Sequence, residues 1–343
     1  MSCYVGLDVS TKETAICVVD EAGDRVWAGT CRTGPYVIAA VLERRAPGAV
    51  KVGIETGPLT VWLWHALNER GLPIVCLHAR HAAAALKLQM NKTDRNDALG
   101  LARLVRSGWY RPVAVRSIET HRLRALLITR DQLVGMRTAL INKIRGLAKT
   151  FGILIGPGKG GTFVRHVRAQ LLPDDPIMNS LFESLLALLS TIQERSHAIA
   201  KQLARIGRQN KVCRLMMTMP GVGPITAISF VTTIEDPHRF RRSQDVGAYL
   251  GLTPRRYQSG EVDINGRISK CGDRLTRKLL FEAANAMLSR TSLPLALKEW
   301  GAAIGRRSGF WKARVALARK LSVILHRMWI EERPFEPKVT AMA

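Results

Sequence analysis

Four carboxylates occur in sequence contexts that are typical of a metal-binding site. Asp8 interrupts the apolar run VGLDVS, and Glu55 ends the apolar run KVGIE. Both runs predict strands, and burying an unpaired carboxylate in a sheet is costly unless a cation, a proton or an exit at the strand end relieves it. Asp94 and Asp97 are three residues apart, which puts both on one face at the start of a predicted helix.

Taken together, these four acids predict a site for a hard divalent cation. Carboxylate oxygens are the ligands that Mg²⁺ or Mn²⁺ prefers. Two such ions about 3.5–4 Å apart can activate an attacking oxygen and stabilise a leaving oxygen at a phosphodiester. Taken singly, each acid has a structural alternative, and for Asp94 the alternative is a helix cap, with Thr93 or Asp94 as the capping residue. Capping does not account for Asp97.

The charge balance of the chain indicates a polyanionic partner. The 343 residues include 52 Lys and Arg against 27 Asp and Glu, a net charge of +25. Residues 1–110 hold 13 basic and 10 acidic residues, whereas the remainder holds 39 and 17, a net charge of +22. The nearly neutral first third is typical of a chemistry module, and the basic remainder is typical of a surface that binds phosphates. General solubilising charge is the alternative.

The composition excludes several other classes of protein. No apolar run reaches the roughly 18–20 residues that span a bilayer, and the N-terminus does not have the pattern of a signal peptide. We therefore expect a cytoplasmic protein with no membrane partner. Six cysteines are scattered without a CxxC pair, so we expect neither disulfides nor structural zinc.

Residues 1–112 alternate strand and helix patterns. An antiparallel meander is predicted first, and alternating helices and parallel strands follow, which together indicate a mixed α/β sheet covered by helices. The expected strands are 3–9, 14–20, 25–30, 50–55 and 72–77, and the expected helices are 36–45, 59–69, 79–88 and 94–106.

Residues 113–210 predict two long helices with apolar residues every seven positions. The two series are Leu126, Leu133, Leu140 and Leu147, then Leu185, Ile192, Ile199 and Ile206. Such seams favour an antiparallel coiled-coil arm, a dimer contact or packing within one chain. We expect a homo-oligomer, either a dimer or a tetramer.

Residues 211–343 predict a mainly α domain with a polar hairpin-like segment. Gly221 and Gly223 lie in the turn PGVGP between helical runs, the pattern of a helix-hairpin-helix. Glycines there let backbone N–H groups approach a phosphate, and a plain tight turn is the alternative. Phe310, Trp311 and Trp329 are predicted to be core residues of the last helices rather than base-stacking residues.

These motifs resemble a known family. GLDVS, GIETG and the DxxD helix resemble the ribonuclease H-like fold of the Holliday-junction resolvase RuvC. Nearly the whole chain resembles the DEDD transposases of the insertion-sequence one-ten family, described as bridge-RNA-guided recombinases. KTDRNDA, AYLGLTP, RRYQSG and GRISK are the most specific parts. The resemblance implies that Asp8, Glu55, Asp94 and Asp97 form the DEDD metal site.

The resemblance further implies a serine nucleophile, which the QSG motif places at Ser259, and a covalent phosphoserine intermediate. It also implies an element-encoded RNA that selects donor and target DNA by base pairing. From the residues alone, Ser259 before Gly260 is a turn residue. Ser269 is the competing serine, although a cap or turn role fits it better. The basic residues near enough in sequence to contact DNA and neutralise transition-state charge are Arg255, Arg256, Arg267 and Lys270.

No nearby histidine stands out as a base for Ser259, so we expect the carboxylate site to approach it during the reaction. One alternative function is a RuvC-like, Mg²⁺-dependent junction endonuclease that uses the carboxylates alone. Another is a non-catalytic nucleic-acid-binding scaffold. A sugar-kinase-like ATPase shares the GLDxS opening, but the Gly-rich phosphate loops it needs are not found in the right context.

Overall fold

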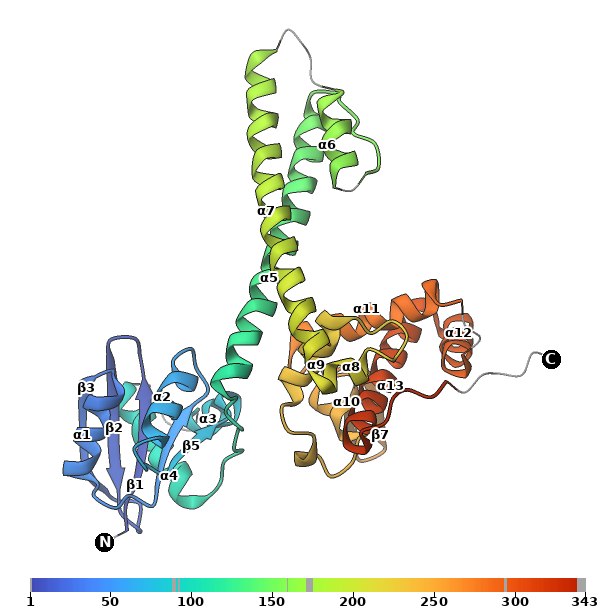
Figure 1. Cartoon of the computed structure of the whole chain (residues 1–343). Coiled ribbons are helices and arrows are strands. Elements are labelled where there is room, and N and C mark those ends of the chain that lie inside the picture. Colours follow the sequence, from blue (N-terminus) through green and yellow to red (C-terminus); the bar gives the residue numbers. More distant parts are fainter. Residues whose placement is uncertain are drawn as a thin grey trace. The chain divides into compact units, whose positions relative to one another are not determined.

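The computed structural model describes residues 2–87, 91, 93–158, 160–170, 175–292 and 295–337. Contacts within the chain define two compact units, Met1–Ile118 and Glu119–Ala343 (Figure 1). The boundary between the two units, after Ile118, lies near the domain boundary expected at residue 112. The expected division at residue 210 stays a prediction. None of the helices in the described part of the chain is long and apolar enough to span a bilayer.

The first unit contains a five-stranded mixed sheet in the order β3-β2-β1-β4-β5. The strands are β1 (Tyr4–Val9), β2 (Glu13–Val19), β3 (Arg25–Arg32), β4 (Lys51–Glu55) and β5 (Ile74–Leu77). β1, β2 and β3 pair antiparallel, whereas β4 pairs parallel with both β1 and β5. The predicted mixed α/β sheet is therefore confirmed.

Helices cover both faces of this sheet. α1 (Pro35–Arg45) and α2 (Thr60–Asn68) share one hydrophobic core with the inward-facing residues of β1 and β4. α4 (Asp94–Ser107) packs on the opposite face, against β1 and β2. α3 (Ala79–Leu86) lies beside α4 and is shorter than predicted, and residue 88 of the expected helix lies outside the described residues.

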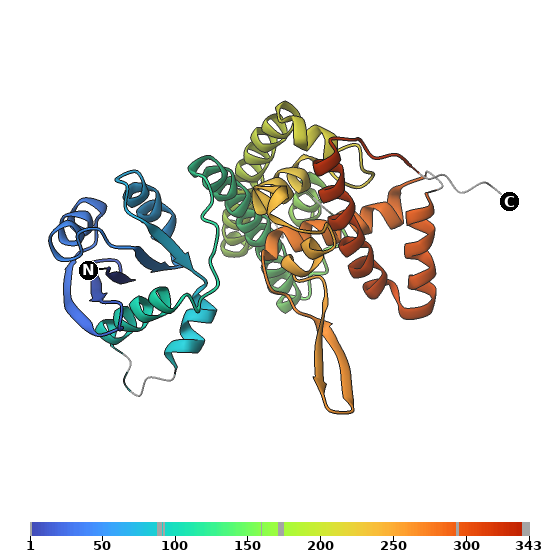
Figure 2. The ribbon, with the colours of Figure 1, turned by 90° about the horizontal axis from the view of Figure 1, so that it is seen from below.

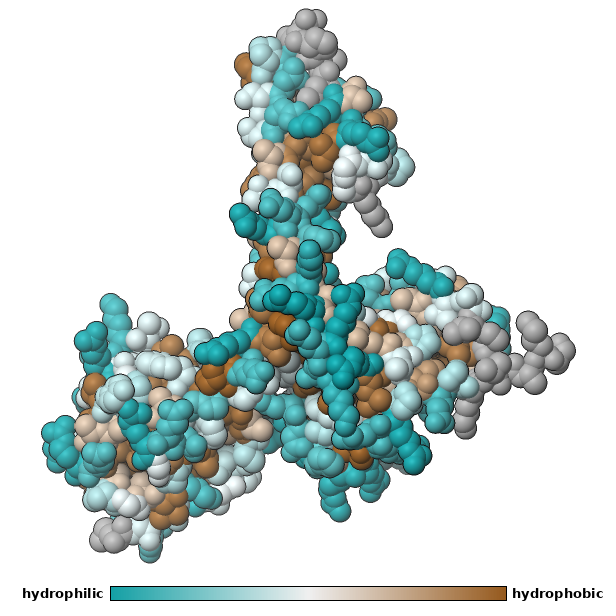
Figure 3. All heavy atoms as spheres, viewed as in Figure 1, coloured by the Kyte–Doolittle hydropathy of each residue, from teal (hydrophilic) through white to brown (hydrophobic). Residues whose placement is uncertain are grey.

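The second unit begins with an arm of helices. α5 (Ile118–Thr150) and α7 (Pro176–Gln209) run alongside each other, and the short α6 (Gly161–Arg168) packs at their far end (Figure 1). Apolar residues of all three helices form a separate core there. Figure 3 shows further hydrophobic (brown) side chains at the surface of this end of the arm. At the other end, Leu127 and Leu203 join the core of the remaining helices.

Between these two cores, α5 and α7 leave an open groove of about 1170 Å³. Polar and charged side chains line much of it, among them Arg137 on α5 and Glu194 on α7. Leu133 and Leu140 of the predicted seam are only half-buried. The two predicted long helices are confirmed, while continuous coiled-coil packing between them stays a prediction.

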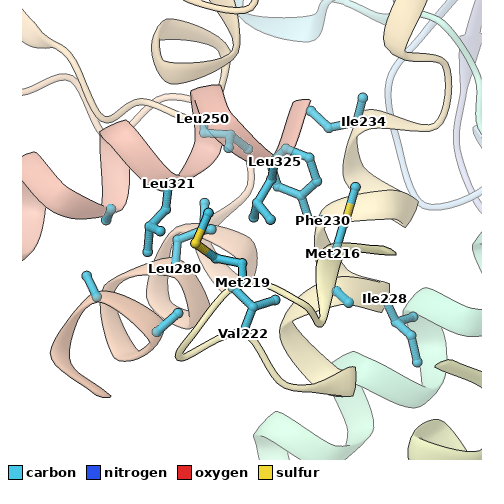
Figure 4. Close-up of a cluster of buried hydrophobic side chains, with 14 of the residues drawn as sticks. Met216, Met219, Val222, Ile228, Phe230, Ile234, Leu250, Leu280, Leu321 and Leu325 are labelled. Carbon is cyan, nitrogen blue, oxygen red and sulfur yellow. The ribbon is translucent and has the colours of Figure 1, made fainter. Parts of the chain in front are cut away.

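The rest of the second unit is a bundle of helices around one core (Figure 4). Met216, Phe230, Leu280 and Leu321 lie at its centre, each from a different helix. The helices are α8 (Lys211–Met216), α9 (Pro224–Ile234), η1 (Pro237–Arg239), α10 (Asp245–Tyr249), α11 (Arg274–Arg290), α12 (Ala296–Ser308) and α13 (Phe310–Glu331). β6 (Pro254–Ser259) and β7 (Val262–Ile268) form a hairpin. The predicted mainly helical C-terminal region is confirmed.

The core assignment of two aromatic residues is wrong. Phe310 is 65% exposed and Trp311 is 71% exposed, because α12 ends and α13 begins at a corner around Gly309. Trp329 is half-buried and packs against the central core, as predicted.

Candidate active site

Two glycines let α4 approach the sheet closely. Gly6 on β1 and Gly53 on β4 are register partners. A Cβ on Gly6 would lie 2.1 Å from the carbonyl oxygen of Ala98, and a Cβ on Gly53 would lie 2.3 Å from Cγ2 of Val105. Both glycines therefore face α4, and neither position has room for a side chain.

The same register puts two of the predicted carboxylates on the face covered by α4. Successive side chains of a strand point to opposite faces, so Asp8 faces the same side as Gly6, and Glu55 the same side as Gly53. Asp8 and Glu55 follow directly on the register pair Leu7 and Ile54, near the carboxyl ends of neighbouring parallel strands. Both carboxylates are half-buried.

The other two acids lie in the first turn of α4. Thr93 is the N-cap, and its Oγ1 accepts a hydrogen bond of 3.2 Å from the backbone N–H of Asn96. Of the two capping alternatives, the structure therefore shows Thr93. Asp94 is exposed and Asp97 is half-buried. Negative charge in a first turn also stabilises the helix dipole, which gives both aspartates a structural contribution.

The donor set fits a hard divalent cation chemically, because all four side chains offer carboxylate oxygens. Among the described residues, no group of three or more His, Cys, Asp or Glu side chains is close enough to hold a metal ion. Burial, and secondly the charge of Glu55, raise the pKa of Cys76 on the adjacent strand to about 11, so this thiol remains protonated.

Ser259 lies at the tip of the β6–β7 hairpin, which projects from the helices of its unit (Figure 2). It pairs with Val262 across a two-residue connection, in which Gly260 has φ 55°. Glycine with positive φ at the first central position is the signature of a type II′ hairpin turn. Ser259 is exposed, and no residue in the described ranges hydrogen-bonds to its hydroxyl.

The two faces of this hairpin differ in chemistry. Tyr257, Val262 and Ile264 lie on the face of Ser259 and are 65%, 46% and 58% exposed. The opposite face carries Arg256, which makes a bidentate ion pair of 2.7–2.8 Å with Asp263. This pair raises the pKa of Arg256 and lowers that of Asp263 through their shared hydrogen bonds.

The other predicted phosphate ligands lie toward the base of the hairpin. Arg255 donates a 3.2 Å hydrogen bond to the carbonyl of Ser269, and Arg267 is exposed on β7. Lys270 has φ 55°, and its N–H bonds to the carbonyl of Gly251 at 3.1 Å. These basic side chains are distributed along the hairpin rather than gathered around Ser259.

A half-buried arginine fixes the base of the hairpin. Arg277 on α11 donates to the carbonyls of Leu250 and Cys271 at 2.8 and 2.9 Å, which lie on the two sides of the hairpin. Burial lowers the pKa of Arg277, although the nearby Asp273 opposes this effect. The chain at Gly251 is so close to Cys271 that a Cβ would lie 2.1 Å from its carbonyl oxygen.

Asp273 also takes part in a buried ion pair that sequence reasoning missed. Arg124 on α5 is buried, forms an ion pair with Asp273 and donates a 2.7 Å hydrogen bond to Oγ1 of Thr233 on α9. Asp273 in turn caps α11 by accepting from the N–H of Thr276 at 2.7 Å. The two charged residues are 149 positions apart, so no local pattern could reveal the pair.

The turn predicted to bind phosphate gives its two glycines different environments. Gly221 has φ 86°, and a Cβ there would lie 2.5 Å from the carbonyl of Ala283 on α11. Its glycine requirement therefore follows from packing. Gly223 has no neighbouring atom within 4 Å of a Cβ and precedes α9 without a side-chain cap, so the N-terminus of α9 is the part of this turn that could approach a phosphate.

Comparison with known proteins assigns the chain to a family. Residues 5–152 match a family of DEDD transposases of the IS110 type, and residues 213–300 match the Transposase IS116/IS110/IS902 family. A transposase for insertion sequence element IS1111A from Coxiella burnetii is 30% identical over 330 residues, 94% of this chain and 88% of that protein.

Two further relatives are a probable family 20 transposase from Pseudomonas aeruginosa and a putative transposase from Sinorhizobium fredii. Each is 28% identical, over 72% and 70% of this chain and 75% and 63% of the relative. These likenesses define a DNA transposase. The chain belongs to the IS110 family of insertion-sequence transposases, and DNA is its substrate.

Proposed function

We propose that this transposase cuts and rejoins DNA through Ser259, assisted by a divalent metal held by Asp8, Glu55, Asp94 and Asp97. The proposal is supported chiefly by the position of Ser259, exposed at the tip of a projecting hairpin with no hydrogen-bond partner in the described part of the chain. A nucleophile that attacks a duplex must be accessible to a phosphate of the DNA backbone, and Ser259 meets this requirement. A serine kept only for its turn geometry has no such requirement.

In the proposed cleavage step, Oγ of Ser259 forms a bond to the phosphorus of a DNA phosphodiester. The bond from phosphorus to one sugar oxygen breaks, the hydroxyl proton leaves to a base, and the departing sugar oxygen takes up a proton. The hydroxyl of another strand then attacks the phosphoserine and restores both the serine and a phosphodiester. The bond energy is conserved throughout, which distinguishes strand exchange from hydrolysis.

The carboxylates would hold Mg²⁺ or Mn²⁺. When bound, such an ion stabilises negative charge on phosphate oxygens. Asp8 and Glu55 would provide the fixed part of the site, because the sheet holds them on one face at neighbouring strand ends. Asp94 and Asp97 would complete it from the first turn of α4, in a ribonuclease H-like arrangement.

The basic second unit would bind nucleic acid through Arg255, Arg256, Arg267, Lys270 and the turn at Gly221 and Gly223. We propose an element-encoded guide RNA as a further partner and a homo-oligomer, a dimer or tetramer, as the active form. A net charge of +22 beyond residue 110 is compatible with both RNA and DNA. Sequencing of the nucleic acid that copurifies with the full chain tests the RNA partner directly.

The carboxylate site is tested by strand exchange between donor and target DNA in Mg²⁺, with any copurified RNA retained. Asp8→Asn should lower the rate by about 100-fold or more, since a carboxylate that holds the charge-stabilising metal ion is lost. Asp24→Asn, an exposed aspartate in the same unit, is the matched control and should react like the wild type. Equal rates for both variants would overturn the metal site.

The runner-up function is a metal-dependent junction endonuclease. It predicts that Ser259→Ala continues to cut DNA and that the products are hydrolysed rather than joined. A non-catalytic scaffold predicts that neither Asp8→Asn nor Ser259→Ala changes the outcome. The proposed transposase mechanism predicts the loss of joined products in both variants.

A further inference from the structure

The last part of the second unit carries an uninterrupted excess of positive charge. Between residues 300 and 330 there are seven Lys and Arg residues and no Asp or Glu. They are Arg306, Arg307, Lys312, Arg314, Arg319, Lys320 and Arg327. Arg327 forms an ion pair with Glu331, just beyond this range, and the other six residues leave an excess of positive charge that attracts a polyanion.

Two large aromatic side chains are exposed in the middle of this basic segment. Phe310 and Trp311 begin α13 and are 65% and 71% exposed. Aromatic residues of this size usually lie in the core, and exposed ones in a basic setting mark a contact surface. These two residues belong to α13 and not to the β6–β7 hairpin that carries Ser259.

Trp311 is held in a defined orientation. Its ring stacks on Phe281 of α11 with centroids 5.7 Å apart and planes inclined by 18°. The guanidinium of Arg314, one turn further along α13, lies 5.2 Å from the centroid of the Trp311 ring. A ring supported in this way loses little further freedom when it binds a flat partner.

The corner between α12 and α13 adds sites for phosphate. Gly309 turns the chain with φ 88° and precedes α13 without a side-chain cap, so no side chain of the N-cap satisfies the first N–H groups of this helix of 22 residues. Arg306 and Arg307 lie in the last turn of α12, and Lys312 lies in the first turn of α13. All three are exposed, and the N-terminal end of a helix favours a negative ligand.

We propose that this α12–α13 corner binds single-stranded DNA, with Phe310 and Trp311 stacking on unpaired bases and Arg306, Arg307 and Lys312 contacting the backbone. Aromatic side chains beside a cationic track are the means by which proteins bind single strands without sequence preference. Paired bases present their faces to one another, so a duplex offers the rings nothing to stack on. Strand exchange by a DNA transposase must at some stage unpair bases, which gives this surface its ligand.

The test measures the binding of the full chain to a fluorescent oligothymidine and to a duplex of equal length by anisotropy. Trp311→Ala should weaken single-strand binding by about 5- to 150-fold and duplex binding much less. Trp311→Phe should retain most of the affinity, because an aromatic face remains. Trp109→Ala is the matched control: Trp109 is also 71% exposed, but it lies in the first unit.

A second variant tests the phosphate contacts. Arg306→Ala combined with Arg307→Ala should weaken single-strand binding and flatten its dependence on salt, since fewer counterions are released. Melting temperatures of all variants should match the wild type, which separates a lost contact from a lost fold. The binding assay needs neither the carboxylates nor Ser259, so its result is independent of the proposed mechanism.

Three results would overturn the proposal. Trp311→Ala could bind single-stranded DNA as tightly as the wild type. It could instead lose single-strand and duplex affinity equally, which would show that stacking on unpaired bases contributes nothing. Finally, in the same assay with an oligouridine of equal length, Trp311→Ala could lose affinity for this RNA strand alone, which would assign the corner to RNA instead of DNA.

Discussion

Gly6 and Gly53 are register partners on adjacent parallel strands, and both lie directly beneath α4. Their lack of side chains allows the backbone of α4 to rest on the sheet. Because side chains alternate along a strand, Asp8 and Glu55, two residues later, lie on this same face of the sheet. The glycines in GLDVS and GIETG thus position the carboxylates that follow them.

Gly6→Ala should therefore destabilise the first unit and impair the carboxylate site together. A Cβ 2.1 Å from the carbonyl of Ala98 cannot be accommodated by rotation of a side chain, so α4 must shift. Overpacking of this kind costs about 1–3 kcal/mol or more in the free energy of unfolding. Chemical denaturation of the first unit measures it.

Gly34→Ala is the control for this substitution, because no atom lies within 4 Å of a Cβ there and its φ of 177° is ordinary extended backbone. If Gly6→Ala proves as stable as Gly34→Ala, the close approach of α4 is not what orders this site.

The buried ion pair of the second unit should be worth far more than the exposed one on the hairpin. Arg124→Met removes the ion-pair partner of Asp273 and leaves only the nearby Arg277 to offset its charge, which costs up to about 3–5 kcal/mol in largely buried pairs. The side chains of Arg124 and Asp273 are only 8% and 15% exposed, against 59% and 42% for Arg256 and Asp263. Arg256→Gln should accordingly leave the unfolding of this unit unchanged. Urea unfolding followed by circular dichroism compares them, and equal losses would contradict the assignment.

The stability of the second unit should fall in mild acid because of His326. Its Nε2 donates to the carbonyl of Pro237 at 2.8 Å and its Nδ1 accepts from Ser243 at 2.9 Å, a neutral arrangement. Burial lowers the pKa of His326 below its usual 6.5. Between 6.5 and that lower value the unfolded chain binds more protons than the folded one, so stability decreases as the pH falls through this window.

His326→Gln should be less stable than the wild type above pH 6.5 but should lose less stability on acidification. Thermal unfolding across this range measures the slope, with His197→Gln, an exposed position on α7, as the control. An unchanged slope in His326→Gln would assign the acid sensitivity to other groups.

Much of the first unit could be predicted because the apolar residues of its strands and helices follow recognisable patterns. Short apolar runs located all five strands, and the glycine-flanked acids located the carboxylate-bearing strand ends. The contact of Gly6 with Ala98 joins residues 92 positions apart, so its role became visible only in the folded chain.

Less of the second unit could be predicted from the sequence. α12 was not predicted, because Gly301 and Gly305 lie at its buried positions and weaken its apolar pattern. Phe310 and Trp311 were assigned to the core because large aromatics are usually buried there. Only the corner at Gly309 shows that they are exposed. Arg124 and Asp273 lie in distant segments of the sequence, and no sequence motif around either residue indicates that they pair.

The central claim is that Ser259 becomes covalently joined to DNA. The most direct measurement is the recovery of a denaturant-stable adduct on a nicked DNA substrate that traps the cleaved strand, followed by mass spectrometry of the attached peptide. We predict an adduct on the peptide containing Ser259, its loss in Ser259→Ala, and its persistence in Ser269→Ala. DNA cut efficiently by Ser259→Ala, or an adduct that maps to another residue, would contradict the mechanism.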